Sequence, residues 1–287
     1  MTVADRIRQR SAVSDALPSF LSQLLALGRP IVMGVLNVTP DSFSDGGRFL
    51  DPAKAVAHAE RMVAEGADII DIGAESTRPY GGRVPVSAGD EQARLAPIFA
   101  KIVALGVPVS IDTIKADIAA WALDQGALML NDVWGLQRDS GIVALAAGRP
   151  VPVVIMHNRD KADPMIDILA DMEAFFGRSL EIAERAGIAR ERIVLDPGIG
   201  FGKTPEQSMA AIAQLGRFRS FGLPLLVGAS RKRFISAVTP AEPGQRLGGS
   251  IAAHLLAVEN GAAIVRVHDV AETVQALRVA AAIRRTR

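Results

Sequence analysis

The sequence contains no cysteine among its 287 residues. Without a thiol, the chain can form no disulfide, use no thiolate nucleophile and hold no zinc or iron–sulfur centre through cysteine ligands. Any catalysis or metal binding must therefore use oxygen and nitrogen groups. Because no disulfides are needed, the expected compartment is the cytoplasm.

Aromatic residues are scarce, and neither sign of charge is in excess. Phe, Trp and Tyr make up 5% of the chain, whereas hydrophobic residues make up 49%. A core of Val, Ile, Leu and Ala is typical of proteins built from layers of strands and helices. The formal net charge is +1, so no overall field favours nucleic acid or a membrane surface. We expect neither partner, and any anion would be held by local side chains.

Long apolar runs are also missing, since none approaches the ~20 residues that a membrane-spanning helix requires. Residues 17–28 are apolar, but Asp5 and Asp15 precede them and no small-residue cleavage pattern follows, which argues against a signal peptide. We expect residues 1–30 to form an N-terminal extension whose amphipathic helix packs on the main domain.

From residue 31 onward, short β-branched runs alternate with longer segments of helical period. Strands are predicted at 31–36, 68–73, 107–111, 128–131, 151–156, 193–195, 224–227 and 263–267. Helices are predicted at 52–66, 88–105, 115–125, 139–147, 165–187, 205–220, 244–260 and 270–285. Eight strands and eight helices in strict order predict an α/β fold, a TIM (β/α)8 barrel over residues 31–287.

Polar residues follow the apolar strand runs, at the end of the barrel where such folds place their active sites. Asp112 and Asp196 end two of these runs, and burying them costs several kcal/mol unless hydrogen-bond donors meet them. A ligand with an amidine-like edge would supply donors, with Asn131 and Lys232 as further hydrogen-bonding groups. The alternative is a structural network in which the two carboxylates pair with Lys232 and Arg266.

Cationic groups also follow the strand runs: Arg78, Lys232, Arg266 and His268. Because cations are disfavoured at the N-termini of the helices that come next, they indicate an anionic ligand. With Thr77 as a neutral donor, the set suits a phosphate or diphosphate. A set of surface salt bridges is the alternative interpretation.

Neutral polar residues at the same strand ends have a structural alternative as well. Asn37 would suit Mg²⁺ together with diphosphate oxygens and waters, although one asparagine does not by itself identify a metal site. Ser76, Thr113, Asp132 and Asp269 are of the residue types that cap helices, so a structural role is expected for them.

Five motifs resemble dihydropteroate synthase. They are GVLNVTPDSFSDGG at 34–47, ESTRP at 75–79, DPGIGFGK at 196–203, GASRK at 228–232 and RVHDV at 266–270. The similarity extends over nearly all of residues 31–275, and several long motifs in one order are specific where a single short one is not. The resemblance implies a transferase of folate biosynthesis and a sulfonamide target. Such an enzyme joins 7,8-dihydropterin-6-ylmethyl diphosphate to p-aminobenzoate with Mg²⁺, giving 7,8-dihydropteroate and diphosphate.

The resemblance also implies a role for each matching position. The pterin would be bound by Asp112, Asn131, Asp196, Phe201, Gly228 and Lys232. The diphosphate would be bound by Asn37, Thr77, Arg266 and His268, with Asn37 also binding the metal. The p-aminobenzoate would be bound by Phe43, Arg78, Pro79 and Lys232. Residues that act in the reaction would be Asp45, Arg78, Lys232, Arg266 and His268.

The implied mechanism begins with loss of diphosphate to give a delocalised pterin methylene cation, which the amine then attacks, so no covalent nucleophile is required. The family further implies a homodimer. Departures from the common pattern are PYGGR at 79–83, Arg233 after Lys232, and Gln207-Ser208; all concern the amine site.

Two other functions stay open. A methyltetrahydrofolate-dependent corrinoid methyltransferase would share the acidic pterin site, but it has no diphosphate to release, so the basic motifs argue against it. A catalytically silent paralogue would bind pterin without turnover.

Overall fold

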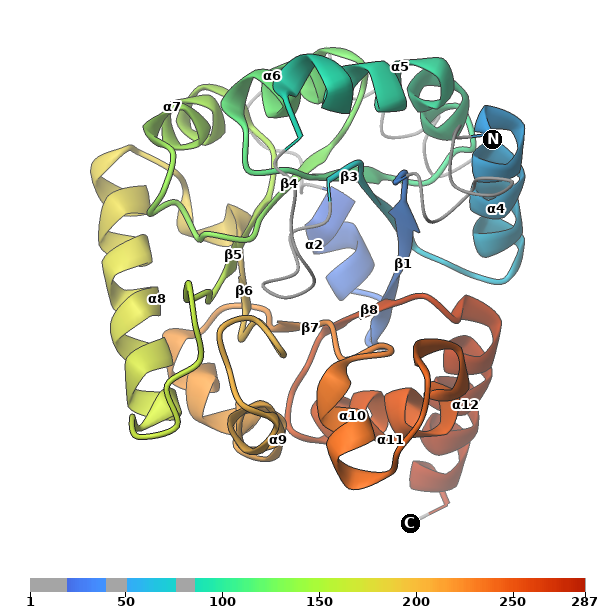
Figure 1. The fold of residues 1–287 in the computed structure, drawn as a ribbon, viewed down its shortest axis with the longest axis vertical. Coiled ribbons are helices and arrows are strands. Elements are labelled where there is room, and N and C mark those ends of the chain that lie inside the picture. Colours follow the sequence, from blue (N-terminus) through green and yellow to red (C-terminus); the bar gives the residue numbers. More distant parts are fainter. Residues whose placement is uncertain (1–19, 40–50, 76–85, 287) are drawn as a thin grey trace.

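The computed structural model describes residues 20–39, 51–75 and 86–286. Eight parallel strands lie in the order β6-β5-β4-β3-β2-β1-β8-β7. They are β1 (Ile31–Asn37), β2 (Ile69–Gly73), β3 (Val109–Asp112), β4 (Met129–Asp132), β5 (Val153–Met156), β6 (Ile193–Asp196), β7 (Leu226–Val227) and β8 (Ile264–Val267). A parallel bridge between Leu195 and Leu225 joins the two ends of the sheet. The predicted eight-stranded barrel is confirmed (Figure 1).

Helices surround the sheet (Figure 1). They are α4 (Pro52–Ala64), α5 (Ala88–Val103), α6 (Ala116–Asp124), α7 (Ser140–Gly148), α8 (Ile168–Arg185), α9 (Pro205–Ala213), α10 (Arg233–Val238), α11 (Leu247–Glu259) and α12 (Val270–Arg284). Their starts follow local chemistry: the Asp51 and Asp167 side chains accept from the first free N–H groups of α4 and α8. No helix in the described ranges is long and apolar enough to cross a membrane.

Short helical segments differ from the prediction. The helix expected at 205–220 ends at Ala213, because Gln214 leaves the α region (φ −110°, ψ 22°), and the chain continues as the 3₁₀ helix η2 (Leu215–Phe221). Helix α10 was not predicted, since its six residues are too few to show a period. Two further 3₁₀ turns are η1 (Arg190–Arg192) and η3 (Pro243–Gln245).

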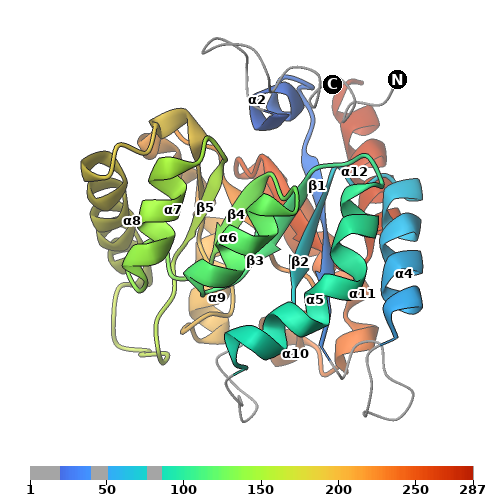
Figure 2. The same cartoon turned by 90° about the horizontal axis from the view of Figure 1, so that it is seen from above.

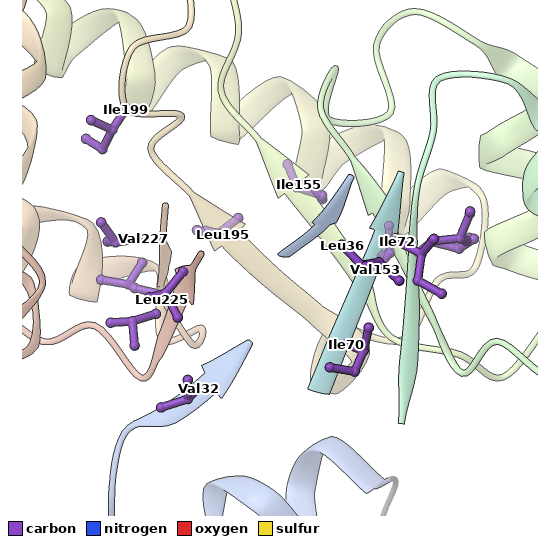
Figure 3. Close-up of a cluster of buried hydrophobic side chains, with 14 of the residues drawn as sticks. Val32, Leu36, Ile70, Ile72, Val153, Ile155, Leu195, Ile199, Leu225 and Val227 are labelled. Atoms are coloured by element: carbon purple, nitrogen blue, oxygen red, sulfur yellow. The ribbon is translucent and has the colours of Figure 1, made fainter. Parts of the chain in front are cut away.

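The main hydrophobic core lies between the strands and the surrounding helices (Figure 3). Successive strand residues point to opposite faces of the sheet, so alternate residues such as Ile70 and Ile72 of β2, or Val153 and Ile155 of β5, face this layer. The intervening residues face the barrel axis, so the inner face of a strand can carry polar side chains while its outer face stays apolar.

A second apolar cluster fills the amino-terminal half of the barrel interior. It contains Ile31, Met33, Ile69, Met129, Val154, Val194, Leu226 and Ile264. Helix α2 (Phe20–Leu25) covers this end of the barrel, with Phe20 and Leu21 buried against the cluster (Figure 2). The described part of the N-terminal extension thus packs as an amphipathic helix, and the space left for a ligand lies at the carboxyl ends of the strands.

Candidate active site

A polar layer lies above the apolar cluster, one step further along the strands. Two residues beyond Ile69, Met129, Val194 and Ile264 stand Asp71, Asn131, Asp196 and Arg266. Residues two apart on a strand share a face, so these side chains point toward the barrel axis like the apolar ones below them. In the same layer, Asp112 of β3 is the register partner of Asn131 on β4.

This layer forms the floor of a pocket at the carboxyl ends of the strands. The pocket is lined by Asp112, Asn131, Val133, Met156, Asp196, Gly198, Ile199, Phe201, Gly228, Lys232 and Arg266. The lining includes all six residues that the family resemblance assigns to pterin binding. Apolar walls with a few convergent polar groups are typical of small-molecule sites.

Arg266 links two buried carboxylates across the barrel. Its Nε donates to Asp71 Oδ2 at 2.5 Å and its Nη2 donates to Asp112 Oδ2 at 2.7 Å. Asn131 Nδ2 also donates to Asp71 Oδ2, at 3.0 Å. The pairing of Asp112 with Arg266, one of the two interpretations left open by the sequence, is therefore present, and Asp71 is an additional member that the sequence analysis did not include.

The two carboxylates share one guanidinium, which leaves an excess of buried negative charge. Asp71 is 0% exposed, and the Oδ1 atoms of both Asp71 and Asp112 are buried without a partner among the described residues. Burial raises the pKa of Asp112 to about 7, and Asp71 adds to the rise while Arg266 opposes it. Burial alone would lower the pKa of Arg266, yet the neighbouring Asp71 and Asp112 raise it.

Asp196 is held differently. Its Oδ1 accepts from the Gly198 N–H at 2.7 Å. Burial raises the pKa of Asp196 to about 6, with the Gly198 hydrogen bond and the Lys232 charge opposing the rise. Asp112 and Asp196 thus reach the pocket from β3 and β6, and a ligand with several N–H groups on one edge would meet both.

Lys232 stands at the rim of the pocket, where α10 begins. Its Nζ lies 4.2 Å from the centre of the Phe201 ring, within the range of a cation–π contact. Phe201 therefore positions the ammonium group as well as forming an apolar wall.

Of the residues expected to bind diphosphate, Asn37 and Arg266 lie on the adjacent strands β1 and β8. Asn37 is the last residue of β1, and His268 follows β8. The His268 ring nitrogen Nδ1 lies 3.0 Å from Ser230 Oγ, and its backbone N–H donates to the same hydroxyl at 3.2 Å. Arg266, Asn37 and His268 thus come from one side of the barrel mouth.

Several predicted residues have other outcomes. Phe43, Asp45, Ser76, Thr77, Arg78 and Pro79 lie outside the described residues. The structural role expected of Asp132 is confirmed, since it accepts from the N–H groups of Trp134 and Leu136. Thr113 Oγ1 likewise accepts from the Lys115 N–H at 3.3 Å. The Asp269 side chain makes no cap hydrogen bond to α12. It pairs with Arg231, and this ion pair joins the loops after β7 and β8.

Sequence reasoning missed Asp71 and some apolar lining residues. Asp71 is a lone carboxylate inside the apolar run IIDIG, and strand alternation places it on the same inner face of the barrel as Asp112. That pattern could have identified it. Met156 and Ile199 line the pocket without any polar feature to mark them, so only the folded chain reveals them.

Comparison with known proteins agrees with this geometry. The family model for pterin binding enzymes matches residues 33–268. The chain is 46% identical over 243 residues to the dihydropteroate synthase of Bacillus subtilis, covering 84% of each chain.

Solved structures are equally similar. The Xanthomonas albilineans dihydropteroate synthase in complex with 7,8-dihydropteroate superposes with a TM-score of 0.82 at 44% identity, covering 90% of this chain and 95% of that one. The same enzyme has been solved with 4-aminobenzoic acid. The Yersinia pestis enzyme in complex with a sulfonamide drug gives a TM-score of 0.83 at 42% identity, with coverage of 90% and 95%. The chain therefore belongs to the dihydropteroate synthase family of pterin-binding enzymes.

Proposed function

We propose that this chain condenses 7,8-dihydropterin-6-ylmethyl diphosphate with p-aminobenzoate, forming 7,8-dihydropteroate and diphosphate. The observation that supports this most directly is one buried pocket that unites Asp112, Asn131, Asp196 and Lys232 in a chain of the dihydropteroate synthase family. The relatives solved with 4-aminobenzoic acid and 7,8-dihydropteroate bind one substrate and the product of this reaction.

The pterin ring would lie against Phe201 with its amino-pyrimidine edge toward the two carboxylates. N–H groups of that edge would donate to Asp112, whose buried Oδ1 is otherwise unpartnered, and to Asp196. Such bonds offset the cost of keeping the carboxylates buried. Asn131 and Lys232 would bind the remaining ring nitrogens and the carbonyl, and Gly228 would leave room for the ring.

The diphosphate would lie at the mouth of the pocket. Nε and Nη2 of Arg266 are engaged by Asp71 and Asp112, so Nη1 is the group offered to a phosphate oxygen. His268 and Thr77 would donate to the same anion. Fixed positive groups stabilise the negative charge that grows on the departing diphosphate, while Asp112, Asp196 and Asp45 stabilise the positive charge that grows on the pterin.

Magnesium is implied by the family resemblance, and the side chains at the pocket mouth fit it. In the described part of the chain, no three His, Asp or Glu side chains gather as a metal cluster, and Mg²⁺ bound to a diphosphate needs only one or two protein oxygens. Asn37, at the end of β1 beside the strand that bears Arg266, would supply an amide oxygen. When bound, the ion would neutralise charge on the leaving group.

The site for p-aminobenzoate is proposed from the family resemblance, which assigns it to Phe43, Arg78, Pro79 and Lys232. Of these, Lys232 stands at the rim of the pocket. Arg78 would pair with the carboxylate of the amine, and the reaction requires that water, which competes for the pterin cation, is excluded from the site.

The decisive experiment follows p-aminobenzoate incorporation and diphosphate release together, with and without Mg²⁺. Stoichiometric, Mg²⁺-dependent formation of both products supports the synthase. Pterin binding with neither product would instead indicate a silent paralogue, and methyl transfer from methyltetrahydrofolate would indicate the methyltransferase.

We further propose a cytoplasmic homodimer. The apolar side chains Leu256 on α11 and Val279 and Ile283 on α12 are 53%, 54% and 56% exposed, which supports an interface between these C-terminal helices. Light scattering that gives the mass of one chain would contradict the dimer.

A further inference from the structure

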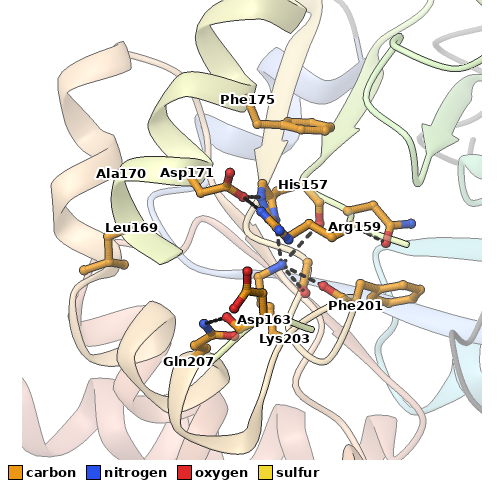
Figure 4. Close-up of polar contacts among 12 residues, drawn as sticks. His157, Arg159, Asp163, Leu169, Ala170, Asp171, Phe175, Phe201, Lys203 and Gln207 are labelled. Atoms are coloured by element: carbon orange, nitrogen blue, oxygen red, sulfur yellow. Dashed lines mark hydrogen bonds and ion pairs between the residues drawn. The ribbon is translucent and has the colours of Figure 1, made fainter. Parts of the chain in front are cut away.

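A buried lysine lies behind the pterin pocket, outside the residues that line it. Lys203 Nζ donates to His157 Nδ1 at 2.7 Å, to the Gly198 carbonyl at 2.9 Å and to the Phe201 carbonyl at 3.1 Å (Figure 4). The His157 carbonyl is a fourth, longer contact at 3.4 Å. The Lys203 amine thus has three close acceptors. Burial lowers the pKa of Lys203 well below its usual value, while Asp196 and Asp171 oppose the fall.

His157 connects this lysine to helix α8. Because the Asp171 carboxylate can only accept, the neutral His157 ring carries its proton on Nε2, and Nδ1 accepts from Lys203 Nζ. Nε2 lies 3.0 Å from Asp171 Oδ2, which Arg159 Nη1 also approaches, at 2.8 Å (Figure 4). Burial, followed by the Lys203 charge, lowers the pKa of His157 to about 3. The His157 ring therefore remains neutral at physiological pH and bridges the Lys203 amine and the Asp171 carboxylate.

The carbonyls that Lys203 holds belong to the segment 198–201, which shapes the pocket. The Gly198 N–H donates to Asp196 Oδ1 at 2.7 Å, so the peptide that orients this carboxylate is next to the carbonyl bound by Lys203. The Phe201 ring supports Lys232 at 4.2 Å. A single amine thus restrains the backbone at two points, one leading to Asp196 and the other to Lys232.

The same segment lies directly on the chain that follows β5. Gly198 and Gly202 have φ values of +64° and +55°. A Cβ atom added to Gly198 would lie 2.0 Å from the His157 carbonyl oxygen, and one added to Gly202 would lie 2.4 Å from Arg159 Cβ. The Gly198 and Phe201 carbonyls are buried in this close contact, so their hydrogen bonds must come from a donor inside the protein.

We propose that Lys203, held by His157 and Asp171, is a positioning residue for pterin binding. Its hydrogen bonds set segment 198–201 so that Asp196 and the Phe201–Lys232 pair face the ring. The proposal rests on the proposed function. It assigns Lys203 no contact with substrate, so its effect should fall on the pterin and not on the amine.

The test replaces Lys203 by methionine, which has a similar length and no donor. Calorimetry with 6-hydroxymethyl-7,8-dihydropterin should show affinity weakened by about tenfold, because a displaced segment 198–201 would turn Asp196 and Lys232 away from the ring and weaken a hydrogen bond to a charged group. The KM for the dihydropterin diphosphate should rise by a similar factor, while the KM for p-aminobenzoate changes less than twofold. A purely structural lysine would reduce the active fraction and leave the dissociation constant unchanged.

A matched control lies at the amino end of β6, the strand that leads into segment 198–201. Arg192 precedes β6 and donates to the carbonyls of Ala146 and of Arg149, so Arg192→Met also removes a cation that binds backbone carbonyls. This variant should lose stability and keep wild-type pterin affinity. Asp171→Asn, which weakens the support of His157 without touching the segment, should weaken pterin binding less than Lys203→Met.

The outcomes separate cleanly. Weaker pterin binding in Lys203→Met but not in Arg192→Met supports the proposal, whereas wild-type affinity in folded Lys203→Met overturns it. If Lys203→Met does not fold, Asp171→Asn decides in the same way. A wild-type protein that binds no pterin would refute the proposed function, and the positioning role with it, before any variant is compared.

Discussion

Replacing Asp71 by asparagine should lower the pH at which the pocket reaches its full affinity for pterin. Ionised Asp112 accepts from pterin N–H groups more strongly than the protonated carboxyl does, and its pKa is raised to about 7 by burial and, in part, by the charge of Asp71, with Arg266 opposing the rise. The substitution removes that charge and leaves Arg266 with Asp112 as its only partner from this pair. Both changes favour the Asp112 carboxylate, so its pKa should fall.

The size of the fall can be worked from the geometry. One guanidinium separates the two carboxylates, with contacts of 2.5 Å to Asp71 and 2.7 Å to Asp112. Two unit charges separated by one such group interact by about 2–3 kcal/mol at an effective dielectric constant of about 20. Screening by Arg266 reduces this, so we expect about one pKa unit, equivalent to about 1.4 kcal/mol. At pH 6 the wild type should bind about tenfold more weakly than at its plateau, and Asp71→Asn only about twofold more weakly.

The assay is calorimetry with 6-hydroxymethyl-7,8-dihydropterin at half-unit steps between pH 6 and 8.5. In this range the other buried carboxylate, Asp196, with a pKa of about 6, contributes equally to both proteins. Asp68→Asn is the control, because Asp68 pairs with Arg29 at 2.7 Å, just before the amino end of the same strand. An unchanged pH midpoint in Asp71→Asn, or an equal shift in Asp68→Asn, would refute the reasoning.

Other substitutions test separate parts of the site. Asp112→Asn turns a required acceptor partly into a donor, and calorimetry at pH 8 should show pterin affinity reduced by about 1–3 kcal/mol. Arg266→Lys keeps the charge but loses the planar fork, so binding assays should show a larger loss for the dihydropterin diphosphate than for the pterin without diphosphate; equal losses would assign Arg266 to the ring. Gly198→Ala places a Cβ 2.0 Å from the His157 carbonyl oxygen at positive φ, so thermal unfolding should show destabilisation of at least about 2 kcal/mol. A wild-type melting temperature would contradict the description of that segment.

The barrel could be predicted because parallel strands covered by helices leave a strong pattern. Their outer faces are mostly apolar, and each of the eight predicted runs overlaps a strand of the structure. Shorter features left no such pattern: α10 spans six residues, and the 3₁₀ character of η2 depends on the local geometry of Gln214. Period can be detected only where an element is long enough to repeat.

The site was predicted where its residues stand at strand ends, and missed where they stand inside a strand. Asp71 lies between Ile70 and Ile72, and its partner Arg266 is 195 positions away in the sequence. Closure of the barrel, which makes β1 a neighbour of both β2 and β8, brings the two together. Lys203 presents a similar case: its motif was visible, but only the fold turns its Nζ back onto His157 and away from the pocket.

The shared guanidinium also bears on how the proposed reaction could proceed. Two carboxylates on one Arg266 leave surplus negative charge beside the pterin, and that surplus contributes to the raised pKa of Asp112. A neutral dihydropterin relieves only part of it through hydrogen bonds. A pterin methylene cation would relieve more, because the opposite charge would then lie in the low-dielectric pocket. The pocket with two carboxylates on Arg266 should therefore bind the pterin methylene cation more tightly than the neutral dihydropterin. Tighter binding of the species that forms during the reaction is the condition for accelerating diphosphate departure.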